Sequence, residues 1–417
     1  MSARSHGEQA GLSPRRPWQG RRVVLGVTGG IAAYKSVQVA RDLTRLGAQV
    51  DVILTPSAER FVGGLSFEGV TGRPVLTQLF SAEGAALHLK LGAEADAIVV
   101  APATADLLAR AAQGRADDLL TTTLLATRAP VLLCPAMNDK MFSHPQVQRN
   151  LAHCRDVLGY RIAGPGTGAL AVGEADGPGR MIEPDAIVQH VGRALGDAST
   201  LRGRRVLITS GPTREAVDPV RFVGNRSSGR MGRALAEAAW RRGAEVTVVS
   251  GPVGLEPAVG AETVRVETGI EMRDAVAARI GAADVVLFAA AVADFRPEEP
   301  RSSKVKRSEG GPSLDVHLVA NPDVAAETRA ARKKGAVVVG FALETEALVE
   351  NARKKLDGKG FDLVVANPAG VAGAGFESDT NQVTLVARDA AEELPMMDKD
   401  AVADAVLDRV EALLAAR

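Results

Sequence analysis

Short apolar runs recur along the first half of the chain, and longer stretches with helical spacing of apolar residues lie between them. Short buried strands that alternate with helices are typical of a parallel sheet covered on both faces. The first half therefore predicts an α/β fold. The predicted strands are 23–27, 50–54, 97–100 and 131–134, and the predicted helices are 32–46 and 104–112.

The second half repeats this scheme, with predicted strands at 206–208, 246–249, 285–290, 337–341 and 363–366 and a closing helix at 401–415. Leu46-Gly47-Ala48-Gln49-Val50 and Arg242-Gly243-Ala244-Glu245-Val246 occupy matching places in the two halves. We therefore predict two Rossmann-like three-layer domains with mostly parallel sheets, at 21–195 and 201–417, with the boundary near 191–204.

Three segments lack a regular apolar pattern. Residues 1–20 are polar and contain Gly, Pro and Arg, which predicts a disordered arm. The glycine-rich segment 165–180 predicts a mobile flap. The charged stretch 296–318 predicts a flexible loop.

Composition narrows the class of partner. Lys+Arg and Asp+Glu are both 50 among 417 residues, so net charge gives no reason to expect a nucleic-acid or membrane partner. Cys134 and Cys154 are too few for a disulfide framework and fit a reducing cytosol. No uninterrupted apolar run reaches the ~18 residues of a membrane span. We expect a cytoplasmic protein that acts on small molecules.

The segment 210–232 lies between a predicted strand and the helical pattern 234–241. In α/β proteins this position binds phosphate, because free backbone N–H groups and the helix dipole point at the anion. The segment carries Arg214, Arg221, Asn225 and Arg230, and arginine forks onto phosphate or carboxylate. Composition alone leaves a solvated connection equally open.

Other candidates are ambiguous when each is taken alone. Gly26-Val27-Thr28-Gly29-Gly30 is not GxGxxG, which argues against a nicotinamide cofactor, and the turn could simply tighten a strand–helix corner. A lone histidine such as His88 is more often structural, and Asn138 could be a helix cap. Lys304 could lie in a solvated loop, and Phe341 could belong to the core.

Several separated motifs, in order, resemble one family. The segment 210–232 is similar to the loop of phosphopantothenate–cysteine ligases, and five later motifs agree with it. Gly26–Lys35 and Pro135–Asn138 resemble the flavin-dependent cysteine decarboxylases. Over residues 20–415 the chain resembles the bifunctional enzymes of coenzyme A synthesis. The five later motifs are Ala290–Asp294, Lys304–Arg307, Asn321–Asp323, Val339–Ala342 and Gly375–Asp379.

For the first domain the resemblance implies a flavodoxin-like fold that decarboxylates phosphopantothenoylcysteine. The flavin oxidises the cysteine thiol to an electron sink, CO2 leaves, and the reduced flavin saturates the resulting enethiolate. His88 is the implied general base and Asn138 the implied carboxylate clamp. The implied FMN-binding residues are Thr28, Gly29, Gly30, Thr55, Ala103 and Thr104.

One position departs from that family. Val172 stands where the flap carries a cysteine that donates a proton, and valine has no proton to donate. Related flavoproteins without this cysteine stop at the enethiol. Either another donor replaces it, with Glu174, Cys134 and Cys154 as candidates, or the reduction is slowed. A further alternative is that the flavin domain is chiefly an assembly scaffold.

For the second domain the resemblance implies a nucleotide-binding ligase. The carboxylate of 4′-phosphopantothenate attacks the α-phosphate of CTP, and the amine of cysteine then displaces CMP from the acyl-cytidylate. Lys304 would reach the triphosphate, Asn225 would act on the acyl-cytidylate and Arg221 would hold the second substrate. The implied nucleotide-site residues are Ala289, Ala290, Asp294, Asn321, Pro322, Asp323, Val324, Phe341, Lys355 and Lys359.

The resemblance also implies Mg2+, bound mostly through water and substrate oxygens, so its protein ligands are not identifiable in the sequence. The choice of CTP over ATP rests on the resemblance and not on a base-reading residue. A homo-oligomer is expected, such as a dodecamer built from trimers of one domain and dimers of the other.

Overall fold

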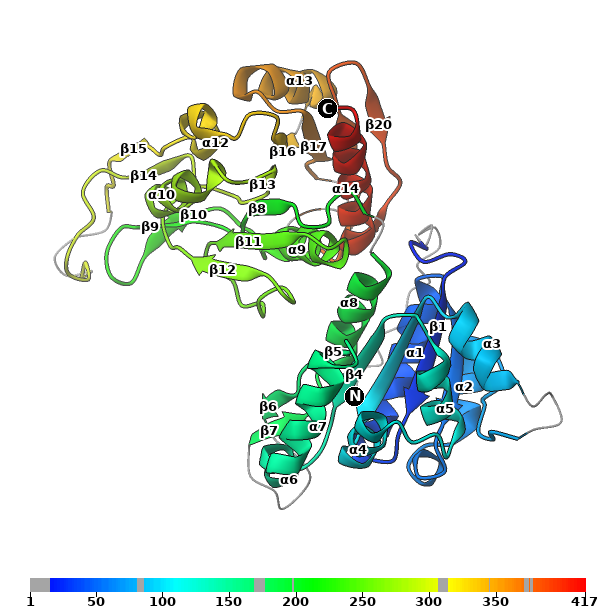
Figure 1. Cartoon of the computed structure of the whole chain (residues 1–417). Helices are drawn as coiled ribbons and strands as arrows, with labels where there is room; N and C mark the ends of the chain where they lie inside the picture. The colour runs from blue at the N-terminus through cyan, green and yellow to red at the C-terminus, as the bar shows by residue number, and fades with distance from the viewer. Residues whose placement is uncertain are drawn as a thin grey trace, which may run out of the picture. The chain divides into compact units, whose positions relative to one another are not determined.

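The computed structural model describes residues 16–80, 86–168, 177–196, 199–306, 314–344, 346–370, 375 and 378–417. The chain forms two compact units, Arg15–Gly196 and Asp197–Arg417, called here the N-terminal and C-terminal units (Figure 1). Within the described residues, no helix combines the length and the apolar character that crossing a membrane would require.

The N-terminal unit is built on a parallel sheet in the order β2-β1-β3-β4-β5. Its strands are β1 (Arg22–Val27), β2 (Gln49–Leu54), β3 (Ala97–Ala103), β4 (Val131–Pro135) and β5 (Arg161–Ile162). The strand order reverses between the neighbouring strands β1 and β3: β2 lies on one side of β1, and β3, β4 and β5 follow on the other side. In such a sheet, ligands bind at this point, beyond the carboxyl ends of the strands.

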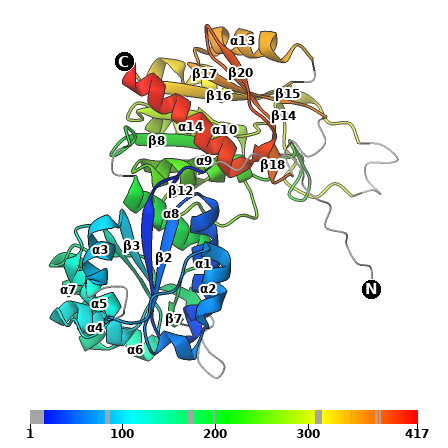
Figure 2. The ribbon, with the colours of Figure 1, turned by 90° about the vertical axis from the view of Figure 1, so that its right-hand side faces the viewer.

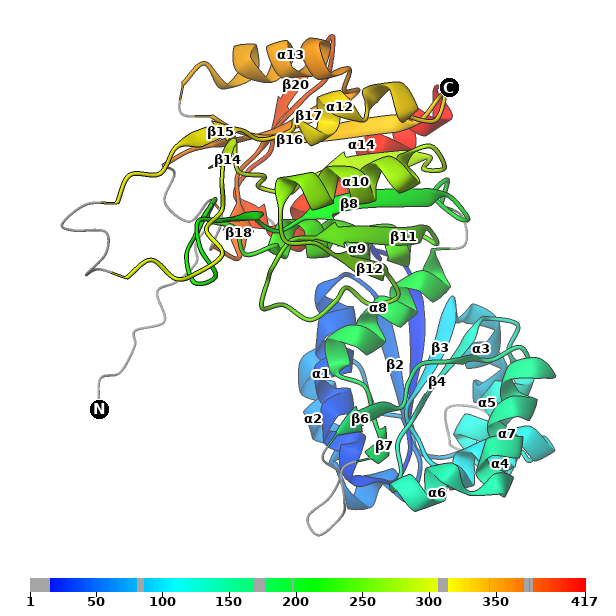
Figure 3. The same cartoon turned by 90° about the vertical axis from the view of Figure 1, so that its left-hand side faces the viewer.

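Helices cover both faces of this sheet (Figure 3). One face is covered by α1 (Lys35–Arg45), α2 (Gly64–Thr71) and α8 (Pro184–Leu195), and the other by α3 (Leu87–Glu94), α4 (Ala105–Gln113), α5 (Leu119–Ala126) and α7 (Pro145–Asp156). The first helical segment begins as a 3-10 turn, Ile31–Tyr34, before α1. The predicted α/β class is confirmed.

The predicted disordered arm, 1–20, is wrong for residues 16–20. Trp18 is only 8% exposed and packs in the core cluster of α1 and the sheet. Its backbone N–H donates to Leu46 O at 3.0 Å, and Gln49 N donates to Arg21 O at 2.8 Å. Burial of a large aromatic side chain fixes this segment against the α1–β2 corner. Residues 1–15 lie outside the described residues.

The C-terminal unit has a sheet in the order β12-β11-β8-β13-β16-β17-β19-β20. Six strands are parallel: β8 (Arg205–Ser210), β11 (Glu245–Ser250), β12 (Glu262–Arg265), β13 (Val285–Phe288), β16 (Val337–Glu344) and β17 (Leu363–Pro368). The last two strands at one side, β19 (Thr384–Val386) and the edge strand β20 (Ala391–Glu393), are antiparallel to their neighbours. The chain switches sides between β8 and β13, so this sheet also has a crossover point suited to a ligand.

Two helices, α9 (Arg230–Arg241) and α14 (Lys399–Ala415), cover one face of this sheet and lie side by side (Figure 2). The other face is covered by α10 (Gly269–Ile280), α12 (Val324–Glu327) and α13 (Leu348–Lys359). The alanine-rich face of α9 is buried, which lets the helix approach the sheet closely.

Three segments contain more structure than the sequence predicted. The segment 210–232 contains a hairpin of β9 (Arg214–Ala216) and β10 (Phe222–Gly224). The flexible loop predicted at 296–318 is wrong at both ends, because β14 (Phe295–Pro297) pairs with β15 (Leu318–Ala320). The predicted flap begins and ends as a hairpin of β6 (Gly166–Gly168) and β7 (Gly177–Arg180). Backbone pairing between distant segments is invisible in a local apolar pattern.

Candidate active sites

A cavity of about 1080 Å³ lies at the carboxyl ends of the N-terminal strands, where the sheet order reverses. Five of the six residues predicted to bind FMN line it: Thr28, Gly29, Gly30, Thr55 and Thr104. Ala103 does not line it and is fully buried at the end of β3. The cavity wall also includes Asn138, Arg180 and Arg110.

Threonine hydroxyls connect the strand ends that form this wall. Thr28 Oγ1 donates to Pro102 O at 2.7 Å and accepts from Thr104 N at 3.3 Å, which joins the turn after β1 to the end of β3. Thr104 Oγ1 accepts from Leu107 N and caps α4. The turn after β1 and the N-terminus of α4 are therefore held together at the cavity.

Glycine is required in the turn after β1. A Cβ on Gly29 would come within 2.4 Å of Ser57 Cβ, whereas one on Gly30 would meet only Thr104 Cγ2, at 3.8 Å. The loops after β1 and β2 therefore approach closely at Gly29, and Gly30 leaves open space beside Thr104. Such space, backbone N–H groups and hydroxyls suit a phosphate group.

Arg110 is a cavity residue that the sequence analysis missed. Its guanidinium contacts Asp106 at 3.0 Å, Asp117 at 3.2 Å and Asp118 at 3.0 Å. Burial disfavours its charge, but these carboxylates outweigh burial and raise its pKa. Arg110 Nε is buried and has no hydrogen-bond partner in the described part of the chain. The i, i+4 spacing of Asp106 and Arg110 was a local signal for part of this cluster.

Asn138 lines the cavity at the start of α6 (Asp139–Ser143), where its Oδ1 accepts from Lys140 N at 3.0 Å. Asn138 is therefore a helix cap, as one of the two alternatives predicted. The cap uses only the side-chain oxygen, so the amide Nδ2 can still donate to a ligand.

Strand β7 is attached to the segment beside Asn138, because Met137 N donates to Gly179 O at 3.0 Å. At the base of β7, Glu183 accepts from both Lys35 and Arg180, at 2.9 and 2.6 Å.

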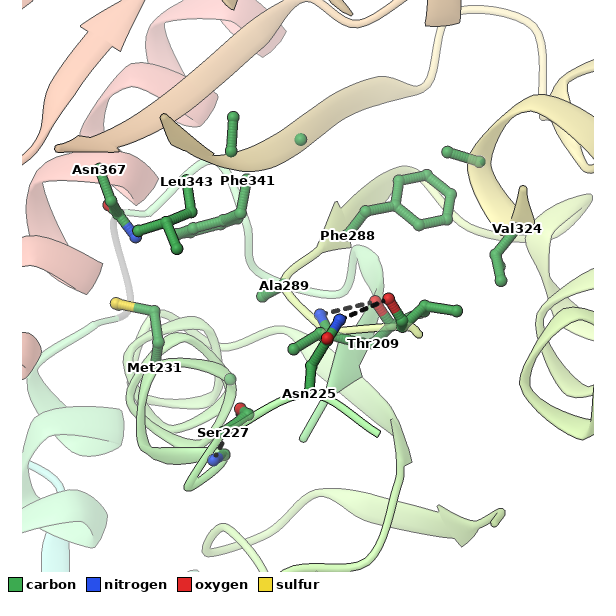
Figure 4. A pocket seen from close by; sticks show the side chains of 18 of the residues that line it. Thr209, Asn225, Ser227, Met231, Phe288, Ala289, Val324, Phe341, Leu343 and Asn367 are labelled. Atoms are coloured by element: carbon green, nitrogen blue, oxygen red, sulfur yellow. Dashed lines mark hydrogen bonds between the residues drawn. The ribbon is translucent and has the colours of Figure 1, made fainter. Parts of the chain in front are cut away.

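In the C-terminal unit a cavity of about 670 Å³ lies beyond the carboxyl ends of β8, β13 and β16. Figure 4 shows Thr209 and Asn225 close together on one wall and Phe341, Leu343 and Asn367 together on another. The structure brings together eleven of the predicted residues: Asn225, Ala289, Ala290, Asp294, Asn321, Pro322, Asp323, Val324, Phe341, Lys355 and Lys359.

Side-chain hydrogen bonds fix the polar wall of this cavity. Thr209 Oγ1 accepts from Ala290 N at 3.2 Å, and Asn225 Nδ2 donates to Val292 O at 2.9 Å. Asn321 Nδ2 donates to Ala293 O at 2.9 Å, which directs its Oδ1 elsewhere. That Oδ1 is buried without a partner among the described residues.

The predicted cations Lys355 and Lys359 are both paired with carboxylates. Lys355 Nζ lies 2.6 Å from Glu344, and Lys359 Nζ lies 2.8 Å from Asp323. Burial disfavours the charged form of Asp323 and is the largest single effect. The bond from Lys359, the charge of Lys359 and the backbone N–H groups of Ala325 and Ala326 together outweigh it and lower the pKa of Asp323. Phe341 is half-buried and lines the cavity while it also packs against the core, so both predicted readings apply.

Comparisons with known proteins agree over both units. Residues 12–196 match the family model described as Flavoprotein, and residues 201–414 match DNA/pantothenate metabolism flavoprotein C-terminal domain. A Vibrio cholerae protein named coenzyme A biosynthesis bifunctional protein CoaBC is 44% identical over 390 residues, which cover 93% of this chain and 97% of that protein. The chain belongs to this family.

The Bacillus subtilis member is likewise 44% identical, over 94% of this chain and 97% of its own length. The crystal structure of the C-terminal domain of a CoaBC protein is 38% identical, covers 53% of this chain and 100% of that chain, and has a TM-score of 0.45. The predicted membership in the family of bifunctional coenzyme A biosynthesis proteins is confirmed.

Four candidate residues from the sequence analysis do not line either cavity. His88 is half-buried on α3, and its Nδ1 is buried without a partner among the described residues. Cys134 and Cys154 are fully buried, and burial raises the pKa of both thiols. They are therefore wrong as donors to the cavity. Lys304 is exposed and lies outside the C-terminal cavity. Val172, Glu174 and Arg307 lie outside the described residues.

Arg221 also lies outside the cavity, and Asp218 connects it to the Lys304 segment. The buried Asp218 carboxylate accepts from Val220 N and Arg221 N at 2.8 Å, from Arg221 Nη1 at 2.5 Å and from Val305 N at 3.2 Å. Burial opposes the charge of Asp218, but these hydrogen bonds lower its pKa to about 2. The sequence analysis missed this residue, whose partners lie far apart in the sequence.

Proposed function

We propose that this bifunctional enzyme of coenzyme A biosynthesis ligates 4′-phosphopantothenate to cysteine in its C-terminal unit, with CTP. Its N-terminal unit then decarboxylates phosphopantothenoylcysteine with FMN. The observation that carries the proposal is the pair of cavities, each at the crossover point of a doubly wound sheet in a member of this family. We expect domains at 21–195 and 201–417, a cytoplasmic location and a homo-oligomer.

In the ligase, the N-terminus of α9 faces the nucleotide phosphates with the residues 227–230 that precede and begin it. Asn225 lies on the same wall and donates to the acyl group. Lys304 reaches the triphosphate from its exposed segment, which Asp218 attaches to the β9–β10 hairpin. Positioning and charge neutralisation carry most of such phosphoryl chemistry.

Mg2+ belongs to the proposal as an ion held by substrate phosphates and water. Among the described residues, no group of three or more His, Cys, Asp or Glu is placed to hold a metal ion. Mg2+ keeps several waters and binds through one or two carboxylates together with substrate phosphates. Asp294 lines the cavity and offers a carboxylate for this, whereas Asp323 is paired with Lys359.

In the decarboxylase, the cavity residues fit FMN. Gly30 and Thr104 leave open space at the turn after β1 and would hold the phosphate, and Arg110 lies on the same cavity wall. Bound flavin supplies the reversible oxidation of the substrate thiol that creates an electron sink for decarboxylation. Asn138 Nδ2 would hold the carboxylate that leaves as CO2.

His88 can act as the general base in this proposal only if the protein is an oligomer. It does not line the cavity of its own unit, so a second copy must bring it to the reacting group. Its Nδ1 is buried without a partner among the described residues.

The proposal is tested with purified protein, 4′-phosphopantothenate and cysteine, with CTP or ATP added in parallel. We expect pyrophosphate, CO2 and saturated phosphopantetheine with CTP, together with a yellow protein. Absence of pyrophosphate with every nucleoside triphosphate would refute the ligase, and a colourless protein that releases no CO2 would refute the decarboxylase.

One observation favours a second outcome for the N-terminal unit, in which decarboxylation occurs but the enethiol is not reduced. Within the described part of that unit no thiol lines the cavity, because both cysteines are buried elsewhere. With Val172 in place of the flap cysteine, the reaction could stop at the enethiol. Mass spectrometry distinguishes the two products, since the enethiol is lighter by one H2. Bound flavin without any CO2 would instead favour the scaffold alternative.

A further inference from the structure

Two helix N-termini meet at one corner of the C-terminal cavity. Helix α9 begins at Arg230, helix α14 begins at Lys399, and both residues line the cavity. The helices run parallel, because Arg242 at the end of α9 contacts Asp408 at 2.6 Å and Glu411 at 3.2 Å, well along α14. Their positive dipole ends therefore point to the same corner.

Positive charge gathers here at Arg230, Lys399 and the N-terminus of α9, which has no side-chain cap among the described residues. The first N–H groups of α14 are already taken, because Ala401 N donates to Asp398 Oδ1 at 2.7 Å and Lys399 N donates to Asp379 O at 3.1 Å. Each helix N-terminus is equivalent to about half a positive charge, and a cation placed there is opposed by the dipole. Lys399 is only 7% exposed, and its pKa is lowered, first by burial and then by the charge of Arg230. Asp379 contacts Arg230 at 2.7 Å, but its side chain is 86% exposed to solvent, which screens it. The arrangement favours an anion.

The hydrogen bonds of Lys399 leave one donor for that anion. An ammonium group has three N–H donors. Lys399 Nζ donates to Gly375 O at 2.9 Å and to Ser378 O at 2.5 Å, and its third N–H has no acceptor in the described part of the chain. Lys355 and Lys359, the other lysines in the described lining, each have a carboxylate partner instead.

We propose that Arg230, Lys399 and the N-terminus of α9 form a phosphate subsite for the β- and γ-phosphates of the nucleoside triphosphate. This inference rests on the proposed function. When the substrate carboxylate forms its bond to the α-phosphorus, the bond from that phosphorus to the β-phosphate oxygen breaks. The electron pair leaves with pyrophosphate, which gains charge as it departs. Cations fixed beside it stabilise this change more than they stabilise the ground state.

The test compares Lys399→Met with a matched lysine. Lys354→Met removes a lysine whose side chain is 69% exposed on α13, paired with Glu350 and outside the cavity lining. Calorimetry would measure CTP, CMP and 4′-phosphopantothenate binding to the full chain with Mg2+. A lost charge-assisted contact weakens binding by about 10- to 100-fold. We expect this loss for CTP in Lys399→Met, with CMP and 4′-phosphopantothenate unchanged and Lys354→Met like wild type.

Other outcomes overturn the inference. Equal weakening of CTP and CMP would mean that Lys399 only supports the fold around Gly375 and Ser378. Weakening of 4′-phosphopantothenate with CTP unchanged would mean that the acyl substrate supplies the phosphate. If Lys399→Met does not fold, Arg230→Gln must show the same loss confined to CTP. Wild-type protein that binds no nucleotide would refute the proposed function itself, which is a separate result.

Discussion

Replacement of Gly179 by alanine should disable the decarboxylase through one backbone contact. Gly179 lies in β7 with φ of +145°, a conformation that L side chains rarely adopt. A Cβ there would come within 2.2 Å of Met137 O. Since a backbone oxygen cannot rotate away, β7 must move off Met137 and the adjacent Asn138, which lines the cavity.

The magnitude follows from two costs. Strain at a disfavoured φ is about 1–3 kcal/mol. Loss of the hydrogen bond from Met137 N to Gly179 O adds about 0.5–1.5 kcal/mol. Because about 1.4 kcal/mol is tenfold, the native arrangement of β7 becomes roughly 10- to 1000-fold less populated. We expect decarboxylation to fall by a factor in that range.

The assay is CO2 release from phosphopantothenoylcysteine, with ligation by the C-terminal unit measured on the same sample. Gly166→Ala on the paired strand β6 is the matched control, because its Cβ would meet Arg180 O at 3.7 Å and Ile182 Cγ2 at 3.9 Å, which are ordinary contacts. Decarboxylation by Gly179→Ala within about threefold of wild type, or an equal loss in Gly166→Ala, would refute the reasoning.

Three further predictions use other groups. Asp218→Asn places an amide N–H against Val305 N–H and the Arg221 guanidinium, so ligation should fall and trypsin should cleave faster after Lys304; unchanged cleavage would contradict this. The pKa of His190 is lowered to about 4 by burial and nearby arginines, so the folded state binds fewer protons than the unfolded chain between pH 4 and 6.5. Stability of the N-terminal unit should therefore fall as pH drops through that window, and His190→Gln should flatten the dependence of the urea midpoint. Cys134→Ala should leave the mass of the decarboxylase product unchanged, because that thiol is buried away from the cavity. A change from the saturated product to the enethiol would instead show that Cys134 donates the proton.

Local patterns were enough to predict the sheets. Buried strands of a doubly wound fold are apolar on both faces, so runs such as those at 23–27 and 206–208 were visible without any contact information. Residues at the ends of those strands, such as Thr28 and Ala290, could also be placed, because parallel strands bring their carboxyl ends to one edge.

The tertiary structure decided what depended on contacts between distant segments. Arg230 and Lys399 meet only because α9 and α14 pack in parallel on one sheet face, and Asp218 joins Arg221 to a segment more than 80 residues away. Trp18 is ordered by its burial against α1, and Cys134 points into the core and not the cavity. The sequence determined which elements form, because secondary structure follows local periodicity. The structure determined which side chains meet, because side-chain direction and helix packing follow from burial across the whole unit.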